Sequence, residues 1–276
     1  MAICSTCPHA CSLAPGKLGR CRSRCGSPDG EAVEPRGYGR ITSLALDPME
    51  KKPIARYLPG TTVLSLGSYG CNMNCPFCQN ASIAQAGEDD VAWQPYAPSE
   101  IVQLAKSLAR KRCVGIAYTY NEPLTMPEFV RETAFPAHEE GLMNVLVTNG
   151  MGSPEILAGL LPAIDALNID LKTIRPEAYA RIGGDLDTVL ENIRLSAQSA
   201  HVEVTTLIVP GFNDSEAEME ELAGTLADID PELTLHVTRF FPASEMRDAR
   251  PTPVGTVFHL ADMARKALTH VFTGNV

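Results

Sequence analysis

From residue 61 to the end of the chain, short apolar runs alternate with longer segments whose apolar positions recur at helical spacing. The runs have the length and composition of buried strands, and we expect six of them, at 62–66, 114–119, 143–148, 163–172, 201–209 and 233–238. Helical spacing is clearest at Ile101, Leu104, Ala105 and Leu108. Six successive β/α units predict a parallel α/β fold, either a partial (β/α)6 TIM-like barrel or an open doubly wound sheet.

Local signals indicate where several of the predicted helices begin and end. Thr125 and Glu128 have the spacing of a capping box, and Gly141 is placed to end the helix that this box opens. Ser215 and Glu218 have the same spacing ahead of a later helix. We therefore expect one helix to start at Thr125 and another just after Ser215.

Residues 1–60 show little periodicity and are rich in Cys, Gly, Pro and Arg. Asp47–Gly60, with three prolines, is typical of an irregular connector. We therefore divide the chain into a Cys-rich metal-binding segment with its connector at 1–60 and a barrel domain at 61–276.

Four cysteines near the N-terminus have the spacing C-x2-C-x3-C-x9-C: Cys4, Cys7, Cys11 and Cys21. Four thiolates at this spacing can close a tetrahedral zinc site or hold an iron–sulfur cluster. Small Cys-rich segments often lack a core of their own and are held together by metal. We favour a second metal, zinc or iron–sulfur, over free thiols.

Composition narrows the class of protein. The chain has 276 residues, of which 45% are hydrophobic, and a formal net charge of −10. This acidic balance argues against a nucleic-acid partner, which normally requires a basic face. No apolar run has membrane-spanning length, and the first residues lack a signal peptide's hydrophobic region. We therefore expect a cytoplasmic protein without a membrane partner, whose nine cysteines serve metal sites more than disulfides.

A second set of cysteines follows the first predicted strand. Cys71, Cys75 and Cys78 have the spacing C-x3-C-x2-C, with Phe77 in the aromatic place before the last. A cubane cluster has four irons, so three thiolates leave one iron open to a substrate or cofactor. This triad resembles the signature of the radical S-adenosylmethionine (SAM) enzymes. The alternative is a zinc knuckle with a fourth ligand elsewhere.

Polar residues end the next three strands, where parallel α/β folds collect their chemistry. The strands end at Glu122, at Thr148 and Asn149, and at Asp170 and Lys172. SAM carries an ammonium, a carboxylate and a ribose diol. Binding it requires an acid, a cation and short polar groups, and these residues supply them.

Five motifs together are similar to the pyruvate formate-lyase activating enzyme family of radical SAM proteins, and within it to the AmmeMemoRadiSam branch. They are Gly70–Asn80, Tyr118–Pro123, Val147–Gly150, Ile169–Lys172 and Ile208–Asp214. The similarity implies a partial (β/α)6 barrel and a [4Fe-4S] cluster on the Cys71 triad. It also implies that SAM is cleaved reductively to a 5′-deoxyadenosyl radical.

By position, the resemblance places Glu122 at the SAM amine, Thr148 and Asn149 near its methionyl or ribose part, and Asp170 and Lys172 at its carboxylate. From the chemistry of SAM alone, backbone at Val209–Gly211 and near Phe77 is expected to flank the adenine. Asn121 stands in the cofactor motif, where the family usually has glycine before the acid.

Three functions remain open. The first is a radical SAM enzyme that abstracts hydrogen from a small-molecule or protein substrate, with a flavodoxin or ferredoxin as reductant and a Memo or AMMECR1-type partner. The second is an activating enzyme for a glycyl-radical enzyme. We favour the first, because Thr205 and Thr206 stand where activating enzymes often have a basic residue. The third is a non-catalytic iron–sulfur or zinc scaffold or electron carrier.

Overall fold

The computed structural model describes residues 1–276 and contains one eight-stranded sheet, in the order β14-β13-β12-β11-β10-β9-β7-β6. Every neighbouring pair is parallel except β6 and β7. The strands are β6 (Ser43–Pro48), β7 (Thr62–Gly67), β9 (Cys113–Tyr118), β10 (Met143–Thr148), β11 (Ala166–Asp170), β12 (His201–Ile208), β13 (Thr234–Arg239) and β14 (His270–Gly274). The six predicted parallel strands are confirmed, and β14 adds a seventh.

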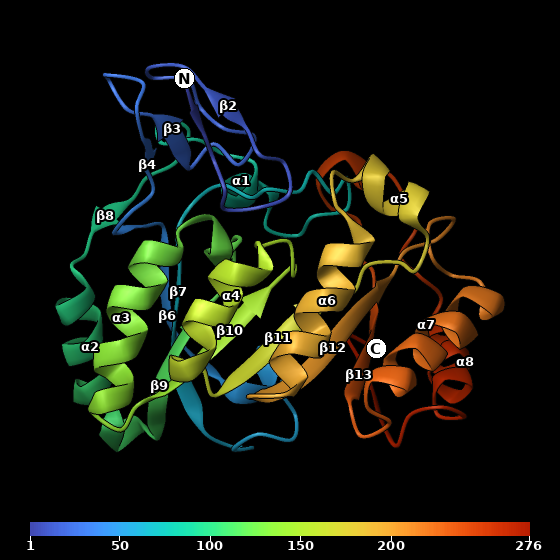
Figure 1. Ribbon diagram of the computed structural model, residues 1–276. Coiled ribbons are helices and arrows are strands. Elements are labelled where there is room, and N and C mark those ends of the chain that lie inside the picture. Colours follow the sequence, from blue (N-terminus) through green and yellow to red (C-terminus); the bar gives the residue numbers. More distant parts are fainter.

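Helices cover the outer face of this sheet (Figure 1). They are α2 (Pro98–Ser107), α3 (Pro127–Glu139), α4 (Pro154–Leu160), α6 (Leu186–Ala197), α7 (Glu216–Ile229) and α8 (Val254–Ala264). Their apolar stripes face the strands, as on α2, where Ile101, Val102 and Ala105 are buried. The short helices α1 (Ala81–Ala84) and α5 (Pro176–Arg181) lie above the ends of the strands in Figure 1. No helix is both long and apolar enough to span a membrane.

The two predicted helix starts have different outcomes. The Ser215 side chain accepts a hydrogen bond from the backbone N–H of Glu218, as an N-cap should. The predicted capping box at Thr125 is wrong, because α3 begins two residues later and has no side-chain cap. Thr125 instead donates its hydroxyl to the carbonyl of Glu122, and Glu128 binds Arg24.

The inner face of the sheet is closed at one end by the segment between β6 and β7. Met49 and Ile54 from this segment are fully buried and pack with residues of four strands: Val63, Ala117, Val145 and Ala166. Asn168 on β11 donates its side-chain amide to the carbonyl of Pro53 over 2.8 Å. Helices lie outside the sheet, and residues 49–61, which we call the plug, fill one end of its inner face. Strands β6 and β14 are edges that do not pair with each other, so the fold is a partial barrel.

The N-terminal residues form small two-stranded pairs. β1 (Ala2–Ile3) pairs with β2 (Ser12–Leu13), and β3 (Arg24–Gly26) pairs with β4 (Val33–Pro35). β5 (Arg40–Ile41) pairs with β8 (Gln94–Pro95). In Figure 1 strands β1 to β4 lie above the sheet, close to α1. β6 lies before the predicted boundary at residue 60, yet it belongs to the main sheet.

Candidate cofactor site at the strand ends

The loop after β7 carries the cysteine triad into a mostly buried position. Cys75 is 8% exposed, and Cys71 and Cys78 are half-buried. Burial raises the pKa of all three thiols, that of Cys75 to about 11, and neighbouring thiols add to the rise at Cys71 and Cys75. Without a cation the thiols are therefore neutral at physiological pH. Metal binding to them would release protons.

The donor set of this loop fits a cluster with one open iron. Three soft sulfur ligands lie within eight residues, and Cys71 Sγ accepts bonds from Asn149 Nδ2 and from the Met73 backbone, each over 3.4 Å. Amide donors to sulfur are a usual feature of iron–sulfur sites. No three His, Cys, Asp or Glu side chains gather as they would around a single metal ion. In a cubane each thiolate binds its own iron, so the sulfurs need not meet at one point.

Asn121 holds the backbone that leads into the triad. Its Oδ1 accepts a hydrogen bond from the backbone N–H of Ser68 over 2.9 Å. Its Nδ2 donates to the carbonyls of Tyr69 and Gly70, each over 3.1 Å. This amide side chain thus binds three successive residues immediately before Cys71. In this structure its polar atoms are engaged with protein backbone.

Glu122 lies at the centre of a buried hydrogen-bond network. Its Oε1 accepts bonds from Thr148 Oγ1 over 2.7 Å and from the backbone of Leu124 over 2.9 Å. Its Oε2 accepts a bond from the backbone of Asn149 over 2.7 Å. Burial raises the pKa of Glu122 to about 7, although these donors oppose the rise. The carboxylate therefore gains from a further cationic partner near neutral pH.

Asp170 and Lys172 form an ion pair at the end of β11. Lys172 Nζ lies 3.0 Å from Asp170 Oδ2, and the lysine side chain is 16% exposed. Burial disfavours its charge, but the Asp170 carboxylate overcomes this effect and holds the pKa of Lys172 above its usual value. Tyr179 accepts a bond from the Lys172 backbone and donates to the Asp170 carbonyl. A cation is thus fixed beside the triad.

Asn149 joins the triad to Glu122. Its side chain donates to Cys71 Sγ and, over 2.9 Å, to Asn72 Oδ1, while its backbone N–H binds Glu122. Asn72 in turn donates to the carbonyl of Met151 over 3.0 Å. Sequence reasoning missed Asn72, because an asparagine between two cysteines is unremarkable by itself.

Phe77 and Val209, the predicted adenine neighbours, are both buried. Phe77 packs against Phe212, with ring centroids 5.2 Å apart. The Val209 backbone donates to Asn213 Oδ1 over 2.8 Å, and Asn213 Nδ2 donates to the carbonyl of Lys172 over 2.7 Å. The loop after β12 is thereby tied to the end of β11. Asn213 lies within a motif that the sequence singled out, but its positioning role did not follow from the pattern.

The second predicted metal set lies beside this site. Cys4, Cys7, Cys11 and Cys21 line one small cavity together with Asn72 and Thr125. The cavity therefore adjoins the loop that carries Cys71, although the two cysteine sets are about 50 or more residues apart in the sequence.

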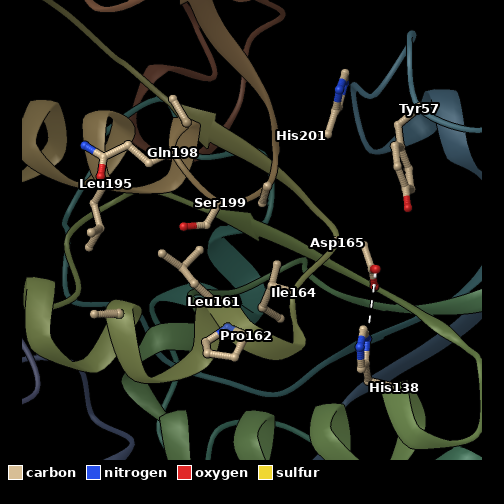
Figure 2. Close-up of a pocket in the computed structure, with 13 residues that line it drawn as sticks. Tyr57, His138, Leu161, Pro162, Ile164, Asp165, Leu195, Gln198, Ser199 and His201 are labelled. Carbon is tan, nitrogen blue, oxygen red and sulfur yellow. Dashed lines mark ion pairs between the residues drawn. The ribbon is translucent and has the colours of Figure 1, made fainter.

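A separate pocket of about 710 Å³ opens at the other end of the strands. Figure 2 shows His138 and Asp165 on one side of it and His201 with Tyr57 on another. Asp165 directly precedes β11, and His201 begins β12. None of the predicted cofactor residues lines this pocket. It is therefore distinct from the site at the carboxyl ends of the strands.

Comparison with known proteins agrees with the site. The model of the radical SAM superfamily matches residues 66–226. A protein of Methanocaldococcus jannaschii described as uncharacterized is 37% identical over 99% of this chain and 81% of its own length. The benzylsuccinate synthase activating enzyme of Thauera aromatica is 27% identical over 68% of this chain. The matched region is 57% of that enzyme's length.

Among solved structures, a domain of the pyruvate-formate lyase-activating enzyme of Bacteroides vulgatus has a TM-score of 0.51 and 18% identity. It covers 58% of this chain and 99% of the domain. At this identity the likeness is one of fold. The family match spans more than half of the chain and includes the cysteine loop and the ends of β9 to β12. The chain belongs to the radical SAM superfamily.

Proposed function

We propose that this protein is a radical SAM enzyme that cleaves SAM reductively and abstracts hydrogen from a small-molecule or protein substrate. Membership of the superfamily implies a [4Fe-4S] cluster and SAM as cofactors. Cys71, Cys75 and Cys78 would hold the cluster, and a flavodoxin or ferredoxin would supply the electron. Bound together, the cluster and SAM supply a carbon radical, while the protein supplies orientation and a water-poor cavity.

The observation that carries this proposal is the hydrogen-bond network between the triad and the buried acid. Asn149 contacts Cys71 with its side chain and Glu122 with its backbone, so a group bound at the sulfur lies close to a carboxylate. Lys172 provides the opposite charge near Cys75. An amino acid cofactor has both an ammonium and a carboxylate, and this site pairs each with a counter-charge.

Each predicted cofactor residue has a proposed task. The buried carboxylate of Glu122 would accept hydrogen bonds from the SAM ammonium. None of its present hydrogen-bond donors carries a positive charge. Lys172, oriented by Asp170, would bind the carboxylate. Thr148 and Asn149 would contact the methionyl or ribose part, and Phe77 and the backbone at Val209 would flank the adenine. Asn121 would act on the cofactor through the cysteine loop that it positions.

Anaerobic incubation with SAM and dithionite tests the proposal. We expect 5′-deoxyadenosine from the wild type and none above background from Cys75→Ala. Cys113→Ala is the matched control, because Cys113 is also a buried cysteine but lies within β9, away from the triad. It should retain the activity. Equal product from wild type and Cys75→Ala would contradict the proposal and favour a non-catalytic metal scaffold.

A second candidate is an activating enzyme for a glycyl-radical enzyme. It is favoured by the benzylsuccinate synthase activating enzyme and by two further relatives with activating enzyme in their names. A glycyl-radical enzyme encoded beside this chain would then gain an organic radical EPR signal on incubation with the protein, SAM and reductant. If no signal appears and 5′-deoxyadenosine still forms, the first candidate is supported.

A further inference from the structure

The N-terminal segment places four thiols around one small cavity, although no three of them gather as closely as the ligands of a single metal ion do. Cys4 lies just after β1, Cys21 just before β3, and Cys7 and Cys11 in the loop between β1 and β2. All four line the same small cavity, which is completed by residues of the segment and of the barrel: Thr6, His9, Gly19, Arg20, Arg24, Asn72 and Thr125. The cavity is thus enclosed from both sides.

Local geometry keeps these thiols together. The Cys4 backbone N–H donates to the carbonyl of Cys11 over 2.9 Å, which fixes the two ends of the loop. A Cβ atom added at Gly19 would lie 3.8 Å from Cys21 Sγ and 3.9 Å from Cys11 Sγ, so these sulfurs flank the same point. None of the four is in a disulfide. Cys25 is also buried in this segment but does not line the cavity.

The segment has little apolar material to hold its shape. The main hydrophobic core contains no buried residue before Ile41. Strands β1 to β4 of the N-terminal segment are two or three residues long, and strand pairs of this size are unstable alone. Small domains with this deficit are commonly held by a metal or by disulfides. Here the cysteines are free and share a cavity, which favours a metal.

The same segment contacts the loop that carries the triad and the loop after β10. His9 Nε2 lies 2.7 Å from the carbonyl oxygen of Asn72, and the backbone of Ser153 donates to the carbonyl of Thr6 over 2.9 Å. A Cβ atom at Gly70 would lie 2.2 Å from the carbonyl oxygen of Cys21, so only glycine permits this approach. Residues on both sides of Cys71 are therefore in contact with the cavity wall.

We propose that Cys4, Cys7, Cys11 and Cys21 form a second, thiolate-bound metal centre that braces the loop of Cys71. Zinc and an iron–sulfur cluster share this ligand chemistry. The centre supports the barrel through His9 and Asn72. Metal binding by the four cysteines is independent of the proposed function. The bracing rests on the proposed function in one respect: the braced loop is the loop that is proposed to hold the radical cluster.

The test uses the full chain with Cys71, Cys75 and Cys78 all changed to Ala, purified anaerobically from cells supplied with iron and zinc. This variant has no triad, so its metal reports on the second centre alone. We expect about one zinc, or about four irons with four sulfides, per chain. Adding Cys7→Ser and Cys11→Ser should remove at least nine-tenths of that metal. Adding Cys25→Ser instead should leave it unchanged.

Hydrogen exchange of the peptide around Asn72, in the same variants, tests the bracing. We expect exchange to become about tenfold faster when Cys7 and Cys11 are changed, and to stay the same with Cys25→Ser. Metal content below about a tenth of an atom per chain in the triad variant overturns the centre, provided that its circular dichroism matches the wild type. Metal that survives Cys7→Ser and Cys11→Ser also overturns it. Unchanged exchange after metal loss overturns the bracing.

Discussion

Replacing Asn121 with alanine tests whether this residue positions the cysteine loop. The change removes one accepted hydrogen bond of 2.9 Å and two donated bonds of 3.1 Å, all to the backbone at Ser68, Tyr69 and Gly70. Ser68 is 3% exposed and Tyr69 is fully buried, so water cannot readily replace the lost partner. At about 1 kcal/mol net for each bond, the free energy of unfolding should fall by about 3 kcal/mol.

Urea unfolding of the metal-free protein, followed by circular dichroism, measures this loss. Asn80→Ala is the matched control, because Asn80 lies in the same loop and its exposed side chain makes a single bond of 2.8 Å to the Tyr120 carbonyl. We expect this control to lose less than about 1 kcal/mol. A loss below about 1 kcal/mol in Asn121→Ala, or equal losses in both variants, would refute the positioning role.

Three further changes test other parts of the site. In Glu122→Gln a carboxyl with a pKa of about 7 when folded is removed. Because that pKa is above the unfolded value of about 4.3, the wild type should lose about 3 kcal/mol of stability as pH rises from about 4.5 to 7. Urea unfolding of Glu122→Gln over the same pH range should show no such loss. Lys172→Met should weaken SAM binding at least tenfold, about 1.4 kcal/mol, by calorimetry, and a change under twofold would contradict its role. Arg24→Gln breaks a two-bond ion pair with Glu128. It should lower stability by about 2 kcal/mol, and a double-mutant cycle with Glu128→Gln that shows no coupling would argue against the pair.

Which strands could be predicted depended on their burial. The six predicted strands are rich in apolar residues, because parallel strands packed on both faces bury most of their side chains. β14 was missed since it is a short edge strand with a half-exposed pattern. The plug between β6 and β7 looks like a loop in sequence. Its structure depends on partners such as Asn168, more than 100 residues away.

The site was predictable where residue type alone limits the chemistry. Three cysteines at fixed spacing and an acid at a strand end have few other uses in such a position. The asparagines were different, because an amide side chain binds a cofactor or a backbone carbonyl equally well. The sequence therefore singled out Asn121 but could not show whether its side chain binds the cofactor or the backbone. Likewise, Glu128 had the spacing of a cap, while its partner Arg24 lies 104 residues away.

The central claim is that Cys71, Cys75 and Cys78 hold a cluster with one iron open to SAM. EPR spectra of the anaerobically reconstituted, dithionite-reduced protein, recorded before and after addition of SAM, test it most directly. We predict that SAM changes the cluster signal of the wild type and leaves the spectrum of Cys75→Ala unchanged. A wild-type signal that saturating SAM does not alter would contradict the claim.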